Sequence, residues 1–312
     1  MSLPFYPDFA PLELSMREDL VPALRSARSG GVADGVSEFT FAGLYLFREH
    51  YRYQVAMLPT GEPLIIGTLG DNPFFLLPLG LPSDVGLVRG LFERGYLKNL
   101  SRSDVETARR ILEPDGFRVV ADRDNSDYLY LTRELAELPG KRYHKKRNHV
   151  NAFRSSYGHY ERALDNRTVH HALEVLESWR SERDEPGDYR ASREALELYR
   201  ELGQSGMVVY VDDLPVAYTL GEPLPAGDSF VIHCEKAVGG YRGAYQFINC
   251  AFAGALADRY TYINREQDLG NPGLRQAKMT YRPAGFVEKF RVVAPAAERQ
   301  YAQVREQACC PG

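Results

Sequence analysis

The stretch 228–264, DSFVIHCEKAVGGYRGAYQFINCAFAGALADRYTYIN, carries the signals of a strand, a glycine-rich link, a helix and a second strand, in that order. Residues 228–237 are rich in residue types that favour strands. After the glycines, apolar residues recur at helical spacing over Ala244–Ala257, and Tyr260–Asn264 is a short strand pattern. A strand, a helix and a further strand in succession predict a mixed sheet covered by helices.

The same alternation extends in both directions from this stretch. In the second half of the chain we expect helices at 142–157, 169–182 and 193–202, a hairpin at 207–211 and 216–221, and a final strand at 286–293. In the first half we expect helices at 16–28 and 84–95, a hairpin at 55–58 and 64–68, and strands at 117–120 and 128–131. The segment Glu134–Gly140 separates the two series. The sequence therefore predicts an α/β fold with two tandem lobes, residues 1–136 and 137–295, each a twisted mixed sheet covered by helices, and a tail at 296–312.

Composition and charge narrow the classes of function. The chain has 312 residues, of which 44% are hydrophobic, so it can bury a substantial core. Its formal net charge of −4 argues against a general nucleic-acid binder, which would be strongly basic. Residues 1–139 hold 14 basic and 20 acidic side chains, whereas residues 140–312 hold 24 and 22. A site for an anionic ligand is therefore expected in the second lobe.

No feature of the sequence indicates export, a membrane span or a metal. The first residues, Met1–Asp19, are acidic and contain no apolar run, so we expect no signal peptide. The longest apolar stretch, 73–82, is too short for a bilayer. The four cysteines, at 234, 250, 309 and 310, form no disulfide framework, and His144 and His149 lack the spacing of metal ligands. We expect a cytoplasmic protein without a tightly bound cofactor. These features are also compatible with a peripheral contact between the protein and a membrane.

Three stretches resemble known families. Tyr281 followed four and five residues later by Gly285 and Phe286 resembles the closing motif of Gcn5-related N-acetyltransferases. The stretches 37–42 (SEFTFA), 140–153 (GKRYHKKRNHVNAF) and 264–290 are similar to the phosphatidylglycerol lysyltransferase C-terminal domain family, formerly a domain of unknown function. This resemblance covers nearly the whole chain. It implies two tandem acetyltransferase-like lobes, akin to enzymes that move amino acids from aminoacyl-tRNA onto lipids or peptidoglycan precursors.

Three residues of the second lobe are candidates for acyl-transfer chemistry. Strand alternation puts Glu235 on one face with His233, where it would act as a general base; the alternative is an ion-paired or solvated glutamate. Tyr281 would protonate a leaving thiolate or ribose hydroxyl, as the matching tyrosine does in many acetyltransferases; the alternative is aromatic packing. Asn264 would orient a carbonyl or an amine, and its alternative is a helix or turn cap.

Basic residues and glycines of the second lobe are candidates for binding a phosphate. The link 239–244 lies between a strand and a helix, but it does not fit the Arg/Gln-x-x-Gly-x-Gly/Ala pattern by which acetyltransferases hold coenzyme A. Its alternative is a plain glycine-rich turn. The basic helix beginning near residue 141 is either an anion-binding face or a solvated one. The expected phosphate-binding residues are Lys141, Lys145, Arg147, Asn148, Arg242, Gly243, Lys278 and Arg282, with Arg275 and Lys289 completing the same pocket.

Together these features predict an acyl- or aminoacyl-transferase with its site in the second lobe. The donor would be aminoacyl-tRNA or acyl-CoA as co-substrate, and the acceptor an amine or a hydroxyl. The alternative from another class is a non-catalytic acetyltransferase-like module that binds tRNA, a nucleotide or another phosphate ligand. The sequence identifies neither the acceptor nor the oligomeric state.

Overall fold

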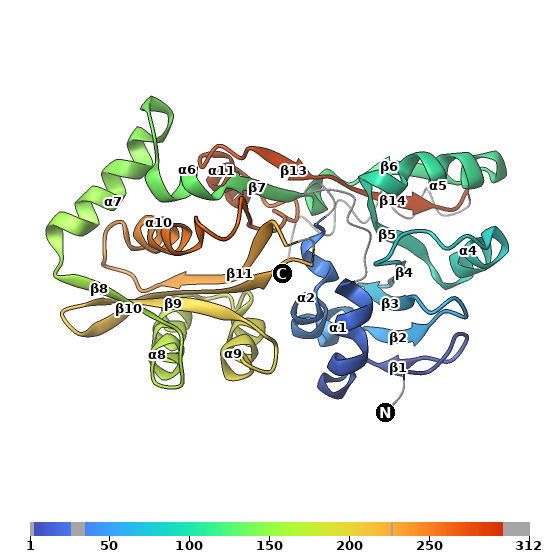
Figure 1. Cartoon of the computed structure of the whole chain (residues 1–312), viewed down its shortest axis with the longest axis horizontal. Coiled ribbons are helices and arrows are strands. Elements are labelled where there is room, and N and C mark those ends of the chain that lie inside the picture. Colours follow the sequence, from blue (N-terminus) through green and yellow to red (C-terminus); the bar gives the residue numbers. More distant parts are fainter. Residues whose placement is uncertain (1–2, 26–34, 226, 296–312) are drawn as a thin grey trace. The chain divides into compact units, whose positions relative to one another are not determined.

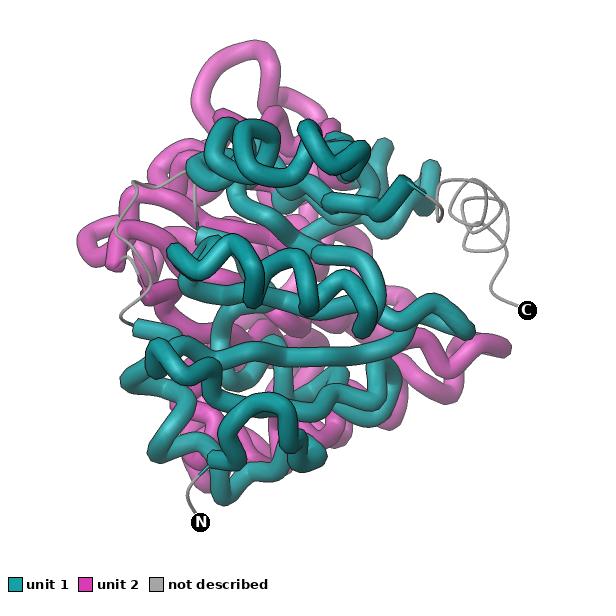
Figure 2. The backbone as a smooth tube through the Cα atoms, turned by 90° about the vertical axis from the view of Figure 1, so that its right-hand side faces the viewer, with its two compact units in different colours: residues 1–127, 267–277, 286–312 teal, residues 128–266, 278–285 magenta. Residues whose placement is uncertain are grey.

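The computed structural model of the chain describes residues 3–25, 35–225 and 227–295. The chain folds into two units, coloured separately in Figure 2. Unit 1 comprises residues 1–127, 267–277 and 286–312, and unit 2 comprises 128–266 and 278–285. The expected lobes were contiguous in sequence. The units are not, because the chain returns to unit 1 after residue 285.

Unit 1 is built on a seven-stranded mixed sheet. Its strand order is β1 (Ala10–Pro11), β2 (Gln54–Met57), β3 (Pro63–Leu69), β4 (Asn72–Leu76), β5 (Tyr96–Ser101), β14 (Lys289–Val293) and β6 (Arg118–Ala121). The β4–β5 pair is parallel and the other pairs are antiparallel. Its described residues include the helices α1 (Arg17–Arg25), α2 (Phe41–Leu46), α3 (Arg48–Tyr51), α4 (Val85–Leu91) and α5 (Val105–Leu112). The expected hairpin at 55–58 and 64–68 is confirmed by the β2–β3 pairing.

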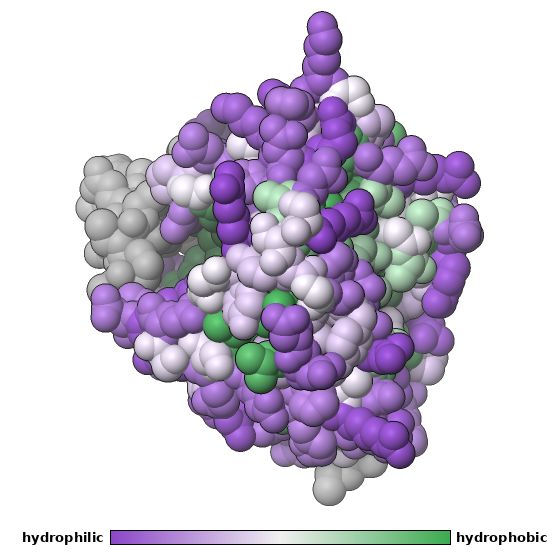
Figure 3. Space-filling view, turned by 90° about the vertical axis from the view of Figure 1, so that its left-hand side faces the viewer, coloured by the Kyte–Doolittle hydropathy of each residue, from purple (hydrophilic) through white to green (hydrophobic). Residues whose placement is uncertain are grey.

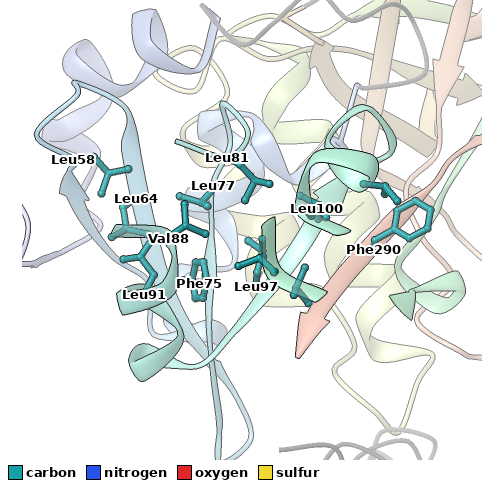
Figure 4. Packing of buried hydrophobic residues seen from close by; sticks show 14 residues of the cluster. Leu58, Leu64, Phe75, Leu77, Leu81, Val88, Leu91, Leu97, Leu100 and Phe290 are labelled. Carbon is teal, nitrogen blue, oxygen red and sulfur yellow. The ribbon is translucent and has the colours of Figure 1, made fainter. Parts of the chain in front are cut away.

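The core of unit 1 lies between the sheet and the helices α4 and α5 (Figure 4). Phe75 of β4 and Leu97 of β5 pack against Val88 and Leu91 of α4, and Phe290 of β14 joins the same cluster. All five side chains are buried. Removing apolar area from water on this scale is the main stabilising contribution to such a unit.

Unit 2 is built on a second seven-stranded mixed sheet (Figure 1). Its order is β13 (Gly285–Val287), β7 (Asp127–Leu131), β12 (Tyr262–Asn264), β11 (Ser229–Ala237), β10 (Leu214–Pro223), β9 (Ser205–Val211) and β8 (His159–Ala163). The central β11 and β12 are parallel and are connected through α10 (Ala244–Leu256), the predicted strand–helix–strand unit. The expected hairpin at 207–211 and 216–221 is confirmed by the β9–β10 pairing.

Helices cover both faces of the second sheet (Figure 1). On one face lie α6 (Thr132–Glu137), α7 (His144–Ser156) and α10, and on the other lie α8 (Thr168–Ser181) and α9 (Tyr189–Glu197). Phe153 of α7 stacks on Phe247 of α10 with ring centroids 4.5 Å apart. The last helix, α11 (Pro272–Met279), has residues in both units. Two mixed sheets covered by helices confirm the predicted fold class.

Several boundaries differ from those expected. The final strand at 286–293 is two strands, β13 and β14, which belong to different sheets and are separated by the exposed Glu288. The strand divides here because the residue after Glu288, Lys289, is buried against acidic side chains of unit 1. The end of the helix expected at 16–28, the tail at 296–312 and the cysteines Cys309 and Cys310 lie outside the described residues.

Candidate active site

The strand β11 presents different side chains to the two helical layers of unit 2. On one side, Glu235 meets Asn249 of α10. On the other, the Lys236 Nζ donates to both carboxylate oxygens of Asp188, at 2.7 and 2.6 Å, and Cys234 lies 3.4 Å from the hydroxyl of Ser192 in α9. The predicted alternation along this strand is therefore confirmed.

Glu235 forms a buried ion pair with Arg265, the residue after β12. Their nearest atoms, Arg265 Nη2 and Glu235 Oε1, are 2.8 Å apart, and the Asn249 amide lies 3.4 Å from the other carboxylate oxygen. The side chains are 8% and 17% exposed. Burial lowers the pKa of Arg265, but Glu235, Tyr281 and Tyr130 together outweigh burial and raise this pKa above its ordinary value, so the guanidinium stays charged. Of the two expected roles, the geometry matches the ion-paired glutamate, and Glu235 holds Arg265 in place.

Tyr281 lies beside this pair and is itself buried, with 8% of its surface exposed. The Arg265 Cζ is 5.2 Å from the centroid of its ring, and the ring of Tyr130 meets it edge-on at 6.5 Å. Burial raises the pKa of Tyr281 to about 12, against the lowering effect of Arg265. The phenol is therefore neutral at physiological pH and keeps its proton available as a hydrogen-bond donor or acid.

Lys146 completes the cluster, and it was not among the predicted site residues. Its Nζ lies 3.8 Å from the centroid of the Tyr281 ring, a cation–π distance. The side chain is half-buried, and burial together with the charge of Arg265 lowers the pKa of Lys146 to about 8. A signal for it was present, because Lys146 stands three residues after Tyr143 and four before Val150, on the inward stripe of the predicted helix. Arg265 was missed because no local pattern marks it.

Asn264 is fully buried at the end of β12. Its side-chain oxygen accepts a hydrogen bond of 2.8 Å from the backbone N–H of Glu266, two residues on. That is the geometry of an Asx turn. Between the two roles considered for Asn264, this hydrogen bond matches the turn cap, which sets the path of the chain through Arg265 and Glu266.

A second charged group lies on the same face of β11. The two ring nitrogens of His233 lie 2.8 Å from a carboxylate oxygen of Glu266 and 3.0 Å from one of Glu222. Two carboxylates on one imidazole require both nitrogens to donate, which only the charged form can do. Burial lowers the pKa of His233, but hydrogen bonds and charges from both glutamates outweigh it and raise the pKa to about 10.

The expected phosphate-binding residues in α7 and in the turn just before it differ in what they contact. The side chains of Lys141 and Lys145 are exposed. Arg147 instead donates to the backbone oxygens of Leu138 and Gly140, the latter at 3.0 Å, so it caps the end of α6. Asn148 bonds to His144 one helical turn before it, at 3.2 Å. The face of the molecule that includes α7 is hydrophilic over most of its area (Figure 3).

The glycine-rich link before α10 has already used part of its hydrogen-bonding capacity. The backbone N–H of Gly239 donates to both oxygens of Glu182, at 2.8 and 3.1 Å, and that of Arg242 donates to the hydroxyl of Tyr157 at 3.2 Å. Gly243 has a φ of 89°, and a Cβ there would lie 2.3 Å from the backbone oxygen of His149. The glycine thus permits close packing of α10 on α7. A carboxylate bonded to this link disfavours an anion at the same place.

The remaining basic residues do not gather into one pocket. Lys278 donates to the backbone oxygens of Arg265 and Glu266, at 2.7 and 3.2 Å, and Arg282 is exposed. Arg275 belongs to unit 1 and pairs there with Asp124 and Asp268. Lys289 also belongs to unit 1, where its wholly buried ammonium contacts Glu38 and, at 2.6 Å, Asp127. The expectation that Lys289 lines a phosphate pocket is wrong, because two carboxylates already enclose it.

Two further features concern metals and membranes. Across residues 3–25, 35–225 and 227–295, no group of three or more His, Cys, Asp or Glu side chains is arranged to hold a metal ion. None of the helices in these ranges combines the length and the apolar character that crossing a bilayer requires.

Comparison with known proteins places the chain in a family. An uncharacterised protein of Mycoplasmoides gallisepticum is 25% identical over 209 residues, 63% of this chain and 64% of that protein, so the chain spans slightly less than two thirds of that curated relative. A crystal structure of a conserved protein of unknown function from Bacteroides thetaiotaomicron has 28% identity and a TM-score of 0.79, covering 91% of this chain and 98% of that chain.

A second solved structure is more distant in sequence. The C-terminal domain of a protein assigned as a lysylphosphatidylglycerol synthetase, from Agrobacterium fabrum, has 15% identity and a TM-score of 0.62, covering 93% of this chain and 94% of that chain. At this identity the likeness concerns the fold. The sequence profile described as phosphatidylglycerol lysyltransferase, C-terminal, matches residues 30–293. This match spans most of the chain and includes the three stretches in which the resemblance was seen, so the chain belongs to the phosphatidylglycerol lysyltransferase C-terminal domain family.

Proposed function

We propose that this chain is an aminoacyltransferase that moves an amino acid from aminoacyl-tRNA to an amine or hydroxyl acceptor, with its active site in unit 2. The observation that carries the proposal is the buried Arg265–Glu235 pair beside Tyr281 in a chain of this family. A fixed cation and a neutral phenol side by side are suited to an acyl-transfer reaction, in which negative charge develops on a carbonyl oxygen and a leaving oxygen needs a proton.

In the proposed reaction the acceptor nitrogen or oxygen forms a bond to the carbonyl carbon of the aminoacyl ester, and the bond from that carbon to the ribose oxygen breaks. Arg265, held by Glu235, stabilises the negative charge on the carbonyl oxygen. The Tyr281 hydroxyl donates its proton to the leaving ribose oxygen. The proton that the acceptor loses afterwards restores the tyrosine, so no net proton enters or leaves.

Two features of unit 2 favour aminoacyl-tRNA over acyl-CoA as the donor. The glycine-rich link, where acetyltransferases hold the pyrophosphate of coenzyme A, has its Gly239 N–H bonded to the carboxylate of Glu182. Meanwhile Lys141 and Lys145 are exposed on or next to α7 and are suited to a phosphate backbone. A donor with an extended polyanionic backbone therefore agrees better with this unit than a single pyrophosphate does.

A binding comparison at stated salt concentrations tests the donor. We expect the purified protein to bind aminoacyl-tRNA more tightly than acetyl-CoA, with an affinity that falls as salt rises. The Lys141→Gln, Lys145→Gln double variant should bind tRNA more weakly, with a salt slope reduced by about 1–2. The matched control neutralises two exposed arginines elsewhere, Arg110→Gln and Arg167→Gln, and should leave both quantities unchanged. Tighter binding of acetyl-CoA would refute this choice of donor.

Transfer itself is tested with tRNA charged with radiolabelled amino acids. Phosphatidylglycerol vesicles serve as the hydroxyl acceptor and a lysine-containing pentapeptide as the amine acceptor. We expect protein-dependent movement of label to one of them, reduced about 10²–10³-fold by Arg265→Met. The matched control Arg259→Met removes an exposed arginine shortly before β12 and should retain the activity.

The second candidate is a module that binds tRNA and catalyses nothing. It is favoured by one observation, the ion pair that occupies Glu235, because a paired carboxylate is not free to act as a base. The two candidates differ in their response to Arg265→Met and Tyr281→Phe. In an enzyme both variants lose transfer and still bind tRNA, whereas a binding module moves no label in any form.

A further inference from the structure

The cluster of Arg265, Tyr281 and Lys146 contains two basic side chains. Arg265 is paired with Glu235, whereas no described carboxylate is paired with Lys146. Among the described residues, the charged and aromatic groups acting on it are Arg265 and Tyr281, and no acidic side chain contributes to its pKa. The amine is nevertheless half-buried against the Tyr281 ring. A lysine in such surroundings has its neutral form favoured by both burial and a neighbouring positive charge.

The charged and titratable groups on the elements around Lys146 are engaged with other partners or are themselves basic. After β12, Arg265 is charged and is itself neutralised by Glu235 of β11. On α10, which packs against α7, Cys250 donates to the backbone oxygen of Ala136. On the side of α6, Glu134 is engaged by Arg142 and Tyr143. The neighbours on α7 itself are basic, namely Lys145, Arg147 and His149. No described carboxylate near Lys146 is therefore left to hold it in the charged form.

We infer that Lys146 is the catalytic amine that takes the proton from the acceptor in the transfer proposed above, on which this inference rests. As the acceptor nitrogen or oxygen bonds to the ester carbonyl carbon, its proton passes to the neutral Lys146 amine, which becomes an ammonium. Tyr281 gives its proton to the leaving ribose oxygen. Through solvent water, the Lys146 ammonium then returns a proton to the Tyr281 phenolate, and both side chains regain their starting forms.

The position of the amine suits this task better than a purely electrostatic one. A base must lie near the reacting groups and be neutral in a substantial fraction of molecules at working pH. Lys146 satisfies the first condition because its Nζ lies 3.8 Å from the centroid of the Tyr281 ring. It satisfies the second because its pKa lies near 8, whereas Arg265 beside it cannot give up its proton. The active form is deprotonated, so the transfer rate rises with pH and levels off above about 8.

Three variants separate a base from a simple cation. Lys146→Arg keeps the charge but cannot accept a proton, and we expect it to lose transfer at least about 10²-fold. Lys146→Met should lose as much. Lys146→Cys alkylated with bromoethylamine, in a chain carrying Cys309→Ser and Cys310→Ser, restores an amine of lower pKa. It should recover activity, with the pH midpoint of transfer shifted downward. Activity in Lys146→Arg within a few-fold of the unmodified chain would overturn the inference.

A labelling measurement tests Lys146 without any transfer reaction. Acetic anhydride modifies neutral amines, so the rate of labelling at each lysine against pH gives its pKa, read by mass spectrometry of the peptides. We expect Lys146 to titrate near pH 8, and the exposed Lys141 and Lys145 of the same digest serve as internal references for the labelling rate. Labelling of Lys146 parallel to these references would overturn the inference.

The two proposals fail in different ways. If the unmodified chain transfers label and Lys146→Arg does so equally, only the role of Lys146 is wrong. If the unmodified chain moves no label from any aminoacyl-tRNA to either acceptor, the proposed function falls, and the role of Lys146 falls with it even where labelling finds a reactive amine.

Discussion

His233 should make the stability of unit 2 depend on pH in a defined window. Its imidazole is buried between Glu222 and Glu266, and its pKa rises from the ordinary 6.5 to about 10. Between these two values the folded chain keeps a proton that the unfolded chain releases. Stability from this group is therefore fully present below pH 6.5 and is lost as pH rises towards 10.

The magnitude follows from the width of the window. Each pH unit in which the folded state holds one extra proton contributes about 1.4 kcal/mol. From pH 6.5 to pH 9 the loss amounts to about 3 kcal/mol, an order-of-magnitude figure for a group buried between two carboxylates. We therefore expect the free energy of unfolding of the unmodified chain to fall by about that much more than the free energy of unfolding of His233→Gln.

Urea denaturation at pH 6 and pH 9 measures the difference. His233→Gln is less stable at pH 6, since both glutamates lose their charged partner, so the test is the change with pH and not the level. Lys236→Gln is a control from the opposite face of the same strand, and it should keep the pH dependence of the unmodified chain. An identical loss of stability from pH 6 to 9 in the unmodified chain and in His233→Gln would refute the charged imidazole.

Two further predictions concern packing and buried charge. Lys289→Met leaves the carboxylates of Glu38 and Asp127 buried without their cation, so unit 1 should lose about 3–5 kcal/mol in urea denaturation, and adding Asp127→Asn should recover part of it. A loss below about 1 kcal/mol would contradict this account of the network. Gly243→Ala should destabilise unit 2 by more than about 1 kcal/mol, because its Cβ would lie 2.3 Å from the His149 oxygen at a φ of 89°. The control Gly254→Ala, also at α10 but with nothing within 4 Å of the new Cβ, should be neutral or slightly stabilising, and equal effects of the two changes would contradict the packing argument.

The fold was predictable because its signals are local. The alternation of β11 and the helical spacing of 244–257 each depend on residues within one segment, and these two elements formed as expected. The strand at 286–293 was predicted as one piece because the pattern of 286–293 contains no sign of an interruption. Its break depends on Lys289 finding Glu38 and Asp127, which lie 251 and 162 residues away in sequence. These ion-pair partners can be identified only when the order of the strands in the sheet is known.

The candidate site was predictable only in part, for the same reason. The alternation of β11 marked Glu235, but the ion pair that defines its role requires β12 to lie beside β11, so Arg265 could not be assigned from local sequence. Lys146 was counted with the exposed basic residues of its helix. Its place on the stripe of Tyr143 and Val150 distinguishes it from Lys145, and periodicity would have indicated this.

The charges on the α10 face of β11 divide into those that are fixed and one that can change. Arg265 is paired with Glu235, and His233 with Glu222 and Glu266, and the raised pKa values of Arg265 and His233 keep these two side chains charged throughout the physiological range. In this cluster of described residues, Lys146 has a cation beside it instead of a carboxylate, and burial together with the charge of Arg265 lowers its pKa to about 8. A site with fixed charges and a single titrating amine can hold an anionic transition state and still move a proton near neutral pH. The pairing of Arg265 by Glu235 is thus as necessary as Lys146 itself, because a carboxylate left free in this cluster would hold the amine in its charged form.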